Sequence, residues 1–189
     1  MLRTVLACVA FASIAACPAL AQAPGVPAYC SSDTAFGQPF GARRVEREGR
    51  SVNAAGNRRV FVPRSTFQPF SEFEAAFTPS TRRLHSVQGT MVLTSREHAR
   101  TAFEQIVGAL AADPRFQDNE IAAPDVGPTG AVWRTAKFYA GNAQSAAEQP
   151  TGLRVTLYFT ERISSESTIA MECVNAEIYR AAEREALAD

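Results

Sequence analysis

The sequence predicts an α+β fold, with an antiparallel sheet of about five to six strands, one long helix packed on a face of that sheet, and a C-terminal helix. Three observations lead to this prediction. Short segments of alternating apolar and polar residues are separated by turn residues, segment 95–112 has apolar residues at helical spacing, and a similar segment ends the chain. Strands joined by short turns pair antiparallel, which favours this fold over βαβ units.

Composition limits the class of protein. The chain has 189 residues, zero formal net charge and 46% hydrophobic residues. These values suit one globular domain and exclude a largely disordered, a collagen-like or a polytopic membrane protein.

The first 23 residues are predicted to be a secretory signal peptide. Arg3 is followed by a short apolar run and by the small-residue site Ala21-Gln22-Ala23. This segment resembles the export signals of bacterial secreted proteins, which implies a periplasmic or secreted location. Residues 24–189 then form a single α+β domain with an N-terminal lead-in over 24–41. No later run approaches the ~20 apolar residues of a transmembrane helix.

Cleavage after Ala23 predicts a mature chain that begins at Pro24, which the intact mass of the exported protein would show. The alternative is that Ile14-Ala15-Ala16-Cys17 is a lipobox, so that Cys17 carries a lipid anchor. The good cleavage site and the apolar residues after Cys17 favour simple cleavage. A diacyl or triacyl mass on Cys17 would contradict that prediction.

Cleavage leaves two cysteines, Cys30 and Cys173. One pair in an exported chain predicts a disulfide, which would tie the start of the mature chain to its last strand. A redox or metal pair usually has close spacing such as C-x-x-C, which this pair lacks.

The elements follow from local pattern and turn residues. Six segments are predicted as strands: 59–62, 72–77, 84–93, 132–140, 153–160 and 168–174. Segment 42–50 is expected to be a short helix or a solvated loop. Segment 115–130 has no period and contains two prolines after its first residues, so it is expected to be a long loop.

Segment 95–112 is the clearest helix. Thr94 and Glu97 have the spacing of a capping box, and Arg100 and Glu104 are expected to pair on the solvated side. The predicted apolar stripe consists of Ala99, Phe103, Ile106, Val107 and Leu110. The second helix covers 176–188, with Asn175 as its expected N-cap.

No catalytic residue, metal site or cofactor is predicted. His85 and His98 have no Cys, Asp or Glu at metal-ligand spacing. Glu72 and Glu74 lie on one side of a strand, where alternation with Phe73 already predicts a solvated face. The glycine-containing segments match no phosphate-binding loop.

Two late strands predict a candidate binding surface. If 132–140 pairs with 153–160, one sheet face gathers Trp133, Lys137, Tyr139, Arg154 and Tyr158. Exposed aromatic residues mixed with cations are typical of binding surfaces. The alternative is that the C-terminal helix covers this face and buries the aromatic residues.

Arginines are concentrated between residues 43 and 64, whereas carboxylates prevail in the second half of the chain. A polyanionic partner would suit these arginines, but the two halves are expected to interleave in the fold and neutralise each other. Nucleic acid is not an expected partner of an exported, neutral chain. The sequence therefore predicts a non-enzymatic cell-envelope protein that binds another envelope protein. The alternative is a small-ligand or glycan-binding domain, or a minor hydrolase of the periplasm.

Overall fold

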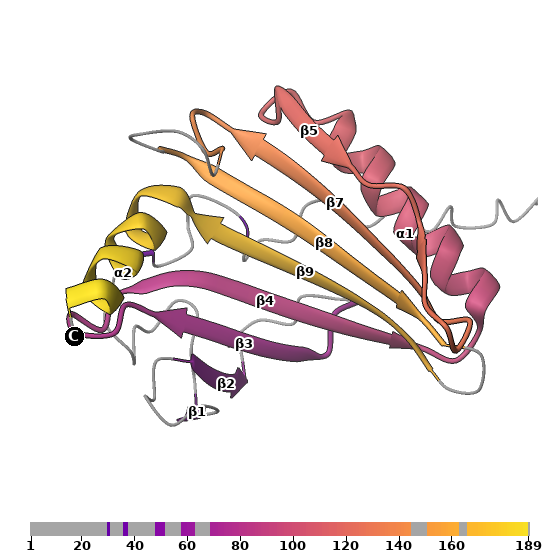
Figure 1. Cartoon of the computed structure of the whole chain (residues 1–189), viewed down its shortest axis with the longest axis horizontal. Helices are drawn as coiled ribbons and strands as arrows, with labels where there is room; N and C mark the ends of the chain where they lie inside the picture. Colours follow the sequence, from indigo (N-terminus) through magenta and orange to yellow (C-terminus); the bar gives the residue numbers. More distant parts are fainter. Residues whose placement is uncertain are drawn as a thin grey trace, which may run out of the picture.

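The computed structural model describes residues 30, 36–37, 48–51, 58–62, 69–144, 151–162 and 166–188, with backbone alone for 48–51 and 58–62. The expected signal peptide, Cys17, most of the 24–41 lead-in and most of the arginine-rich segment lie outside these residues. The described part is an α+β structure with one antiparallel sheet and two helices, α1 (Arg96–Ala111) and α2 (Ala176–Ala188) (Figure 1). The predicted fold class is confirmed.

The strands are β1 (Glu48–Ser51), β2 (Arg58–Val62), β3 (Glu72–Phe77), β4 (Leu84–Leu93), β5 (Asp118–Ile121), β6 (Asp125–Val126), β7 (Val132–Ala140), β8 (Leu153–Glu161) and β9 (Ser167–Asn175). They lie in the order β1-β2-β3-β4-β9-β8-β7-β5, and β6 also pairs with β7. Every pairing is antiparallel. The seven strands from β3 to β9 exceed the predicted five to six, and β1 and β2 extend the sheet beyond β3.

The additional strands arise where the sequence predicted none. β1 lies at the end of segment 42–50, which was expected to be a short helix or a loop, and β5 and β6 lie within the expected loop 115–130. All four residues of β5 are exposed, so the segment has no apolar alternation that could identify it. Its extended conformation comes instead from pairing with β7, from Asp118 opposite Tyr139 to Ile121 opposite Ala136.

Helix α1 begins one residue later than its capping box suggested. The N-cap is Ser95, whose hydroxyl accepts a hydrogen bond from the backbone N–H of His98 at 3.3 Å. The Thr94 and Glu97 capping box is therefore wrong. The apolar stripe is confirmed in full, because the buried residues of the helix are the five that helical spacing selects.

The main core lies between α1 and one face of the sheet. The Phe103 ring of α1 lies 5.2 Å from the Phe159 ring of β8, and both side chains are buried. The guanidinium of Arg134 on β7 lies over the Phe103 ring, 4.9 Å from its centre, in a cation–π contact at this side of the core. The same core includes Val87, Ile169 and other inward residues of β4 and β9.

The charged side chains of α1 bind the sheet and not each other. Arg100 donates two hydrogen bonds to Glu161 at the end of β8, at 2.6 and 2.7 Å. Glu104 forms its ion pair with Arg134. The expected Arg100–Glu104 pair is therefore wrong, because each residue has a partner of opposite charge on the sheet below.

Glu161 makes the attachment of α1 sensitive to acid. Its side chain is buried, and the hydrogen bonds from Arg100 hold the pKa of Glu161 below its ordinary value, against the opposing effect of burial. A lowered pKa in the folded state stabilises the fold above the ordinary carboxyl pKa. That stabilisation is lost as the pH falls through the lowered value.

We therefore expect Glu161→Gln to lower the urea midpoint at pH 7 and to lower it progressively less below about pH 4. Unfolding curves of both proteins between pH 3 and pH 7 measure this difference. The exposed Glu97→Gln, on the same helix, serves as the control for loss of one carboxylate. A deficit of Glu161→Gln that stayed constant over this range would contradict the assignment.

Helix α2 packs on the opposite face of the sheet. Its Tyr179 ring lies 5.1 Å from the guanidinium of Arg154 on β8. Along β8, Arg154 lies an odd number of positions from Phe159, which packs against α1. Successive strand residues point to opposite faces, so Arg154 and Phe159 lie on different sides. The expected cap is confirmed, because Asn175 Oδ1 accepts a hydrogen bond from the backbone N–H of Ile178 at 3.0 Å.

A carboxylate near the end of α2 fixes the turn between β3 and β4. Glu185 accepts hydrogen bonds from the backbone N–H groups of Ser80 and Thr81 at 2.9 and 3.1 Å. It also accepts one from the Thr81 hydroxyl at 2.6 Å. These bonds attach the last turns of the helix to a part of the chain more than 100 residues away.

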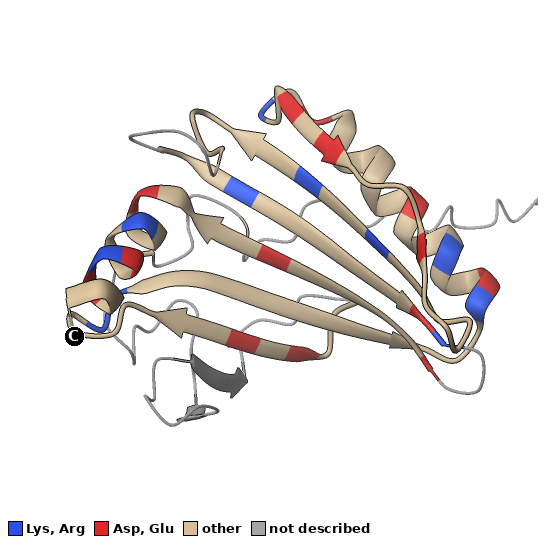
Figure 2. Ribbon diagram, in the orientation of Figure 1, with Lys and Arg blue, Asp and Glu red and all other residues tan. Residues whose placement is uncertain are grey.

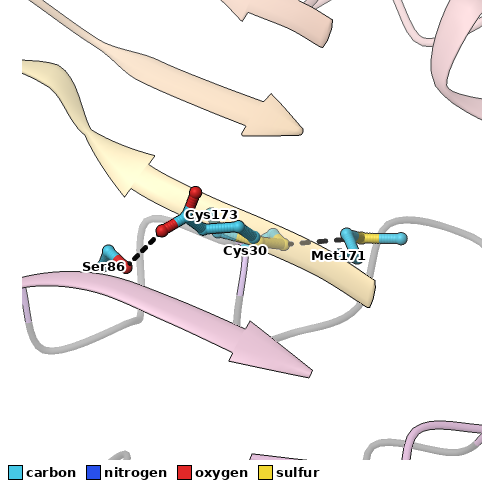
Figure 3. Close-up of a disulfide and its surroundings, with 5 residues drawn as sticks. Cys30, Ser86, Met171 and Cys173 are labelled. Atoms are coloured by element: carbon cyan, nitrogen blue, oxygen red, sulfur yellow. Dashed lines mark hydrogen bonds between the residues drawn. A yellow bond between two sulfur atoms is a disulfide. The ribbon is translucent and has the colours of Figure 1, made fainter. Parts of the chain in front are cut away.

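Cys30 and Cys173, the two cysteines predicted to form a disulfide, are adjacent in the core. Cys30 and Cys173 are fully buried, their Cα atoms are 5.3 Å apart and their sulfur atoms are in contact. This Cα separation suits a disulfide. Figure 3 shows Cys30 beside Cys173 of β9, and the sulfur of Met171, also on β9, lies 3.8 Å from that of Cys30. The arrangement supports the predicted bond, whose chemical test is described in the Discussion.

Candidate open-face binding site

Strands β7 and β8 pair as the candidate binding surface requires. Their register places Thr135 opposite Tyr158 and Tyr139 opposite Arg154. The predicted residues therefore lie on one sheet face, opposite α1: Trp133, Lys137, Tyr139, Arg154 and Tyr158. We call this side of the sheet the open face.

Helix α2 covers one end of the open face. Tyr139 is only 2% exposed and belongs to a small buried cluster with Ala143 and Ala176, the first residue of α2. Arg154 lies against the Tyr179 ring of α2. Coverage by the C-terminal helix, the alternative raised by the sequence, thus applies to Tyr139 and Arg154, which we leave out of the candidate site.

Trp133 and Tyr158 remain accessible beyond the end of α2. Their side chains are 41% and 42% exposed. Trp133 lies opposite Thr160, and Tyr158 lies two residues earlier on the same strand. The two aromatic residues are therefore diagonal neighbours, a spacing that large side chains can bridge.

The indole of Trp133 is seated on Gly127, in the turn after β6. A Cβ atom added to Gly127 would overlap two carbons of the ring. Glycine thus allows the turn to approach the indole closely enough to hold it against β6.

Gly127→Ala is expected to displace the Trp133 ring, at a cost of about 1–3 kcal/mol if the turn cannot move. Trp133 is the single tryptophan of the chain, so its emission maximum and its quenching by acrylamide measure the displacement. The matched control is Gly108→Ala on α1, where an added Cβ has no atom within 4 Å. Identical spectra for Gly127→Ala and the wild type would contradict this seating.

A carboxylate on β9 orients the Tyr158 hydroxyl. Glu172 accepts a hydrogen bond from Tyr158 at 3.4 Å and one from the buried Ser86 at 2.9 Å, the latter drawn in Figure 3. Burial, and then the negative charge of Glu172, raise the pKa of Tyr158. The phenol therefore stays protonated at neutral pH and remains a hydrogen-bond donor.

A surface hollow of about 450 Å³ lies next to the aromatic pair, lined by Glu120, Ile121, Ala122, Thr135 and Lys137. Lys137 and Glu120 form an ion pair across it at 3.1 Å. Sequence reasoning missed this hollow because β5 was expected to be part of a loop. The one sequence feature that could have indicated two strands here is Pro124, which separates β5 from β6.

Neither histidine lines the hollow. His85 is buried and its ring packs at 5.6 Å, in a T-shaped arrangement, against Tyr179 of α2, whereas His98 is exposed in the first turn of α1. Within the described ranges, no group of three or more His, Cys, Asp or Glu side chains has an arrangement that would hold a metal ion. Among those same residues, no helix is long and apolar enough to cross a membrane.

Comparison with models of known protein families finds no match, and comparison with curated proteins finds no significant relative. The candidate site therefore stands on its own geometry, which consists of two neighbouring exposed aromatic residues, an oriented carboxylate and an adjacent hollow on a rigid sheet.

Proposed function

We propose that the protein is a non-enzymatic binding module of the cell envelope that contacts a partner protein through the open face around Trp133 and Tyr158. The observation that carries this proposal is the pair of neighbouring aromatic side chains that α2 leaves more than 40% exposed. The cell-envelope location rests on the export signal expected over residues 1–23.

Exposure of these rings favours a contact surface over a purely structural role. Tryptophan and tyrosine bury large areas on binding and are enriched among residues that dominate interface energies. Both rings stand on hydrogen-bonded residues of the β7–β8 pairing, where the backbone is already ordered. Little conformational entropy is then lost on association, which increases the affinity obtained from a given contact area.

The hollow beside β5 supports a second candidate, a small-ligand or glycan-binding domain or a hydrolase. Sugar rings stack on exposed aromatic residues, and Lys137, Glu120 and Thr135 offer polar groups at the edge of the hollow. A ligand-binding function requires these groups to converge on one molecule, whereas a protein partner requires the wider surface around Trp133 and Tyr158.

Photocrosslinking in intact cells tests the proposal. A full-length chain carries p-benzoylphenylalanine in place of Tyr158, and a control chain carries it in place of Glu97 on α1, which faces away from the open face. We expect a discrete crosslinked protein from position 158 that position 97 does not give. Introducing Trp133→Ala should reduce that product at least about tenfold, as expected for an interface hot spot.

The same product from both positions, or none from position 158, would overturn the proposal. Thermal unfolding followed by circular dichroism shows whether Trp133→Ala is folded. If it is not, Tyr158→Ala and the conservative Tyr158→Phe replace it, with the crosslinker in place of the neighbouring Thr135. In that case a partner lost with alanine and retained with phenylalanine supports a contact made by the ring.

A further inference from the structure

Over strands β3 to β9, whose side chains the structure describes, the open face carries more carboxylates than cations. At its positions on β3 to β9, two cations, Lys137 and Arg154, are accompanied by six carboxylates: Glu72, Glu74, Asp118, Glu120, Asp125 and Glu172. In Figure 2, which colours the residues of both faces, acidic residues lie on β3, β5, β9 and the end of β8, and basic residues lie on β7 and β8.

Both cations are engaged within the protein. Lys137 is paired with Glu120 at 3.1 Å, and the Arg154 guanidinium lies 5.1 Å from the Tyr179 ring centre at the end covered by α2. The charge of Lys137 is therefore compensated by Glu120 at the hollow. The charge of Arg154, at the end that α2 covers, acts on Tyr158 less strongly than that of Glu172.

Two carboxylates flank the aromatic pair directly. Asp125 lies opposite Trp133 in the β6–β7 pairing, and Glu172 accepts the hydrogen bond of Tyr158. The donors to Glu172, Ser86 and Tyr158, are neutral hydroxyls, so these hydrogen bonds bring no positive charge to its carboxylate. Two aromatic faces thus lie between two negative charges.

We infer that the partner contacts the open face through a cationic polypeptide segment. This inference rests on the proposed function and specifies the chemistry of its partner. An arginine or lysine side chain placed over Trp133 or Tyr158 is attracted by the ring face. Neighbouring cations of the segment reach Asp125 and Glu172, which form charge-assisted hydrogen bonds with them. An anionic polymer or an anionic lipid surface is repelled by the same carboxylates.

The single tryptophan measures the local potential directly. Quenching of Trp133 fluorescence by caesium, a cation, is compared with quenching by iodide, an anion, at equal ionic strength. Free N-acetyltryptophanamide serves as the reference, and acrylamide, which is neutral, corrects for the exposure of the ring. After this correction we expect caesium to quench Trp133 more efficiently, and iodide less efficiently, than each quenches the reference. In the double variant Asp125→Asn with Glu172→Gln, this difference between the two ions should decrease, so that both quench about as efficiently as the exposure measured with acrylamide predicts. Preferential quenching by iodide in the wild type would overturn the inference.

Peptide binding tests the inference with defined probes. A fluorescent (Gly-Arg-Ser)₄ peptide is compared with (Gly-Glu-Ser)₄ and with phosphatidylglycerol vesicles on the full mature protein. We expect the cationic peptide alone to bind, and its affinity to fall with added salt. Asp125→Asn with Glu172→Gln should weaken binding about threefold to tenfold, whereas Glu97→Gln, the control on α1, should leave it unchanged.

The outcomes separate this inference from the proposed function. If position 158 captures a partner but the acidic peptide binds as well as the cationic one, the cationic-segment inference is overturned and the proposed function stands. Preferential binding of the vesicles also overturns the inference. If position 158 captures no protein, the proposed function is overturned whichever peptide binds.

Discussion

Replacement of Phe103 by aspartate is expected to unfold the domain. Phe103 has no solvent exposure, and its ring packs against Phe159 and beneath the guanidinium of Arg134. Loss of a buried phenylalanine ring alone costs about 3–5 kcal/mol. An unpaired carboxylate in the cavity adds several kcal/mol more. The sum is comparable to the whole stability of a typical domain, about 5–15 kcal/mol.

Circular dichroism at 222 nm during heating measures this effect. Phe103→Leu, which keeps an apolar side chain, should remain folded with a lower Tm. Leu187→Asp introduces the same charge on α2 at a residue that is 88% exposed and should leave the Tm unchanged. A cooperative transition of Phe103→Asp at the wild-type Tm would show that the core lies elsewhere.

Removal of the Cys30–Cys173 bond is expected to have the next largest effect. The bond would close a loop of 143 residues. In the chain-entropy model, closing such a loop restricts the unfolded chain by about 5 kcal/mol. We therefore expect the mature protein with Cys30→Ser and Cys173→Ser to unfold at a much lower urea concentration than the oxidised wild type.

Thiol counting tests the bond independently of stability. On the chain that begins at Pro24, a thiol reagent should label neither cysteine in the oxidised protein, even when urea exposes the core, and both after reduction. Reduced wild type should then unfold near the midpoint of the double serine variant. Two labelled thiols in urea without prior reduction would refute the disulfide.

The features predictable from sequence were those that depend on one-dimensional periodicity. Helical spacing identified the buried stripe of α1, and alternation identified the residues that share a face within each of β7 and β8. That Trp133 and Tyr158 lie on one sheet face depended on the pairing of these two strands, which the register confirms. Asn175 was identified as a cap because a polar residue preceded an amphipathic run.

The features that sequence missed depend on partners distant in the chain. β5 is a strand because it borders β7, and its exposed residues carry no pattern of their own. Arg100 binds Glu161 on β8, and Glu104 binds Arg134 on β7, so both partners come from strands distant in the chain. Likewise, Tyr139 is buried where Ala143 and the first residue of α2 pack on it, whereas Trp133 on the same strand stays 41% exposed.

The position of β9 determines when the sheet can form during synthesis of the chain. β9 is the last strand in sequence, yet it lies between β4 and β8 in the sheet. Before residues 167–175 have been synthesised, β3–β4 and β7–β8 are two separate hairpins with unpaired edges and no strand joining them. Such late, long-range pairing slows folding and leaves strand edges exposed in the meantime. A chain shortened from its C-terminus past residue 167 would therefore lose the continuity of the sheet itself.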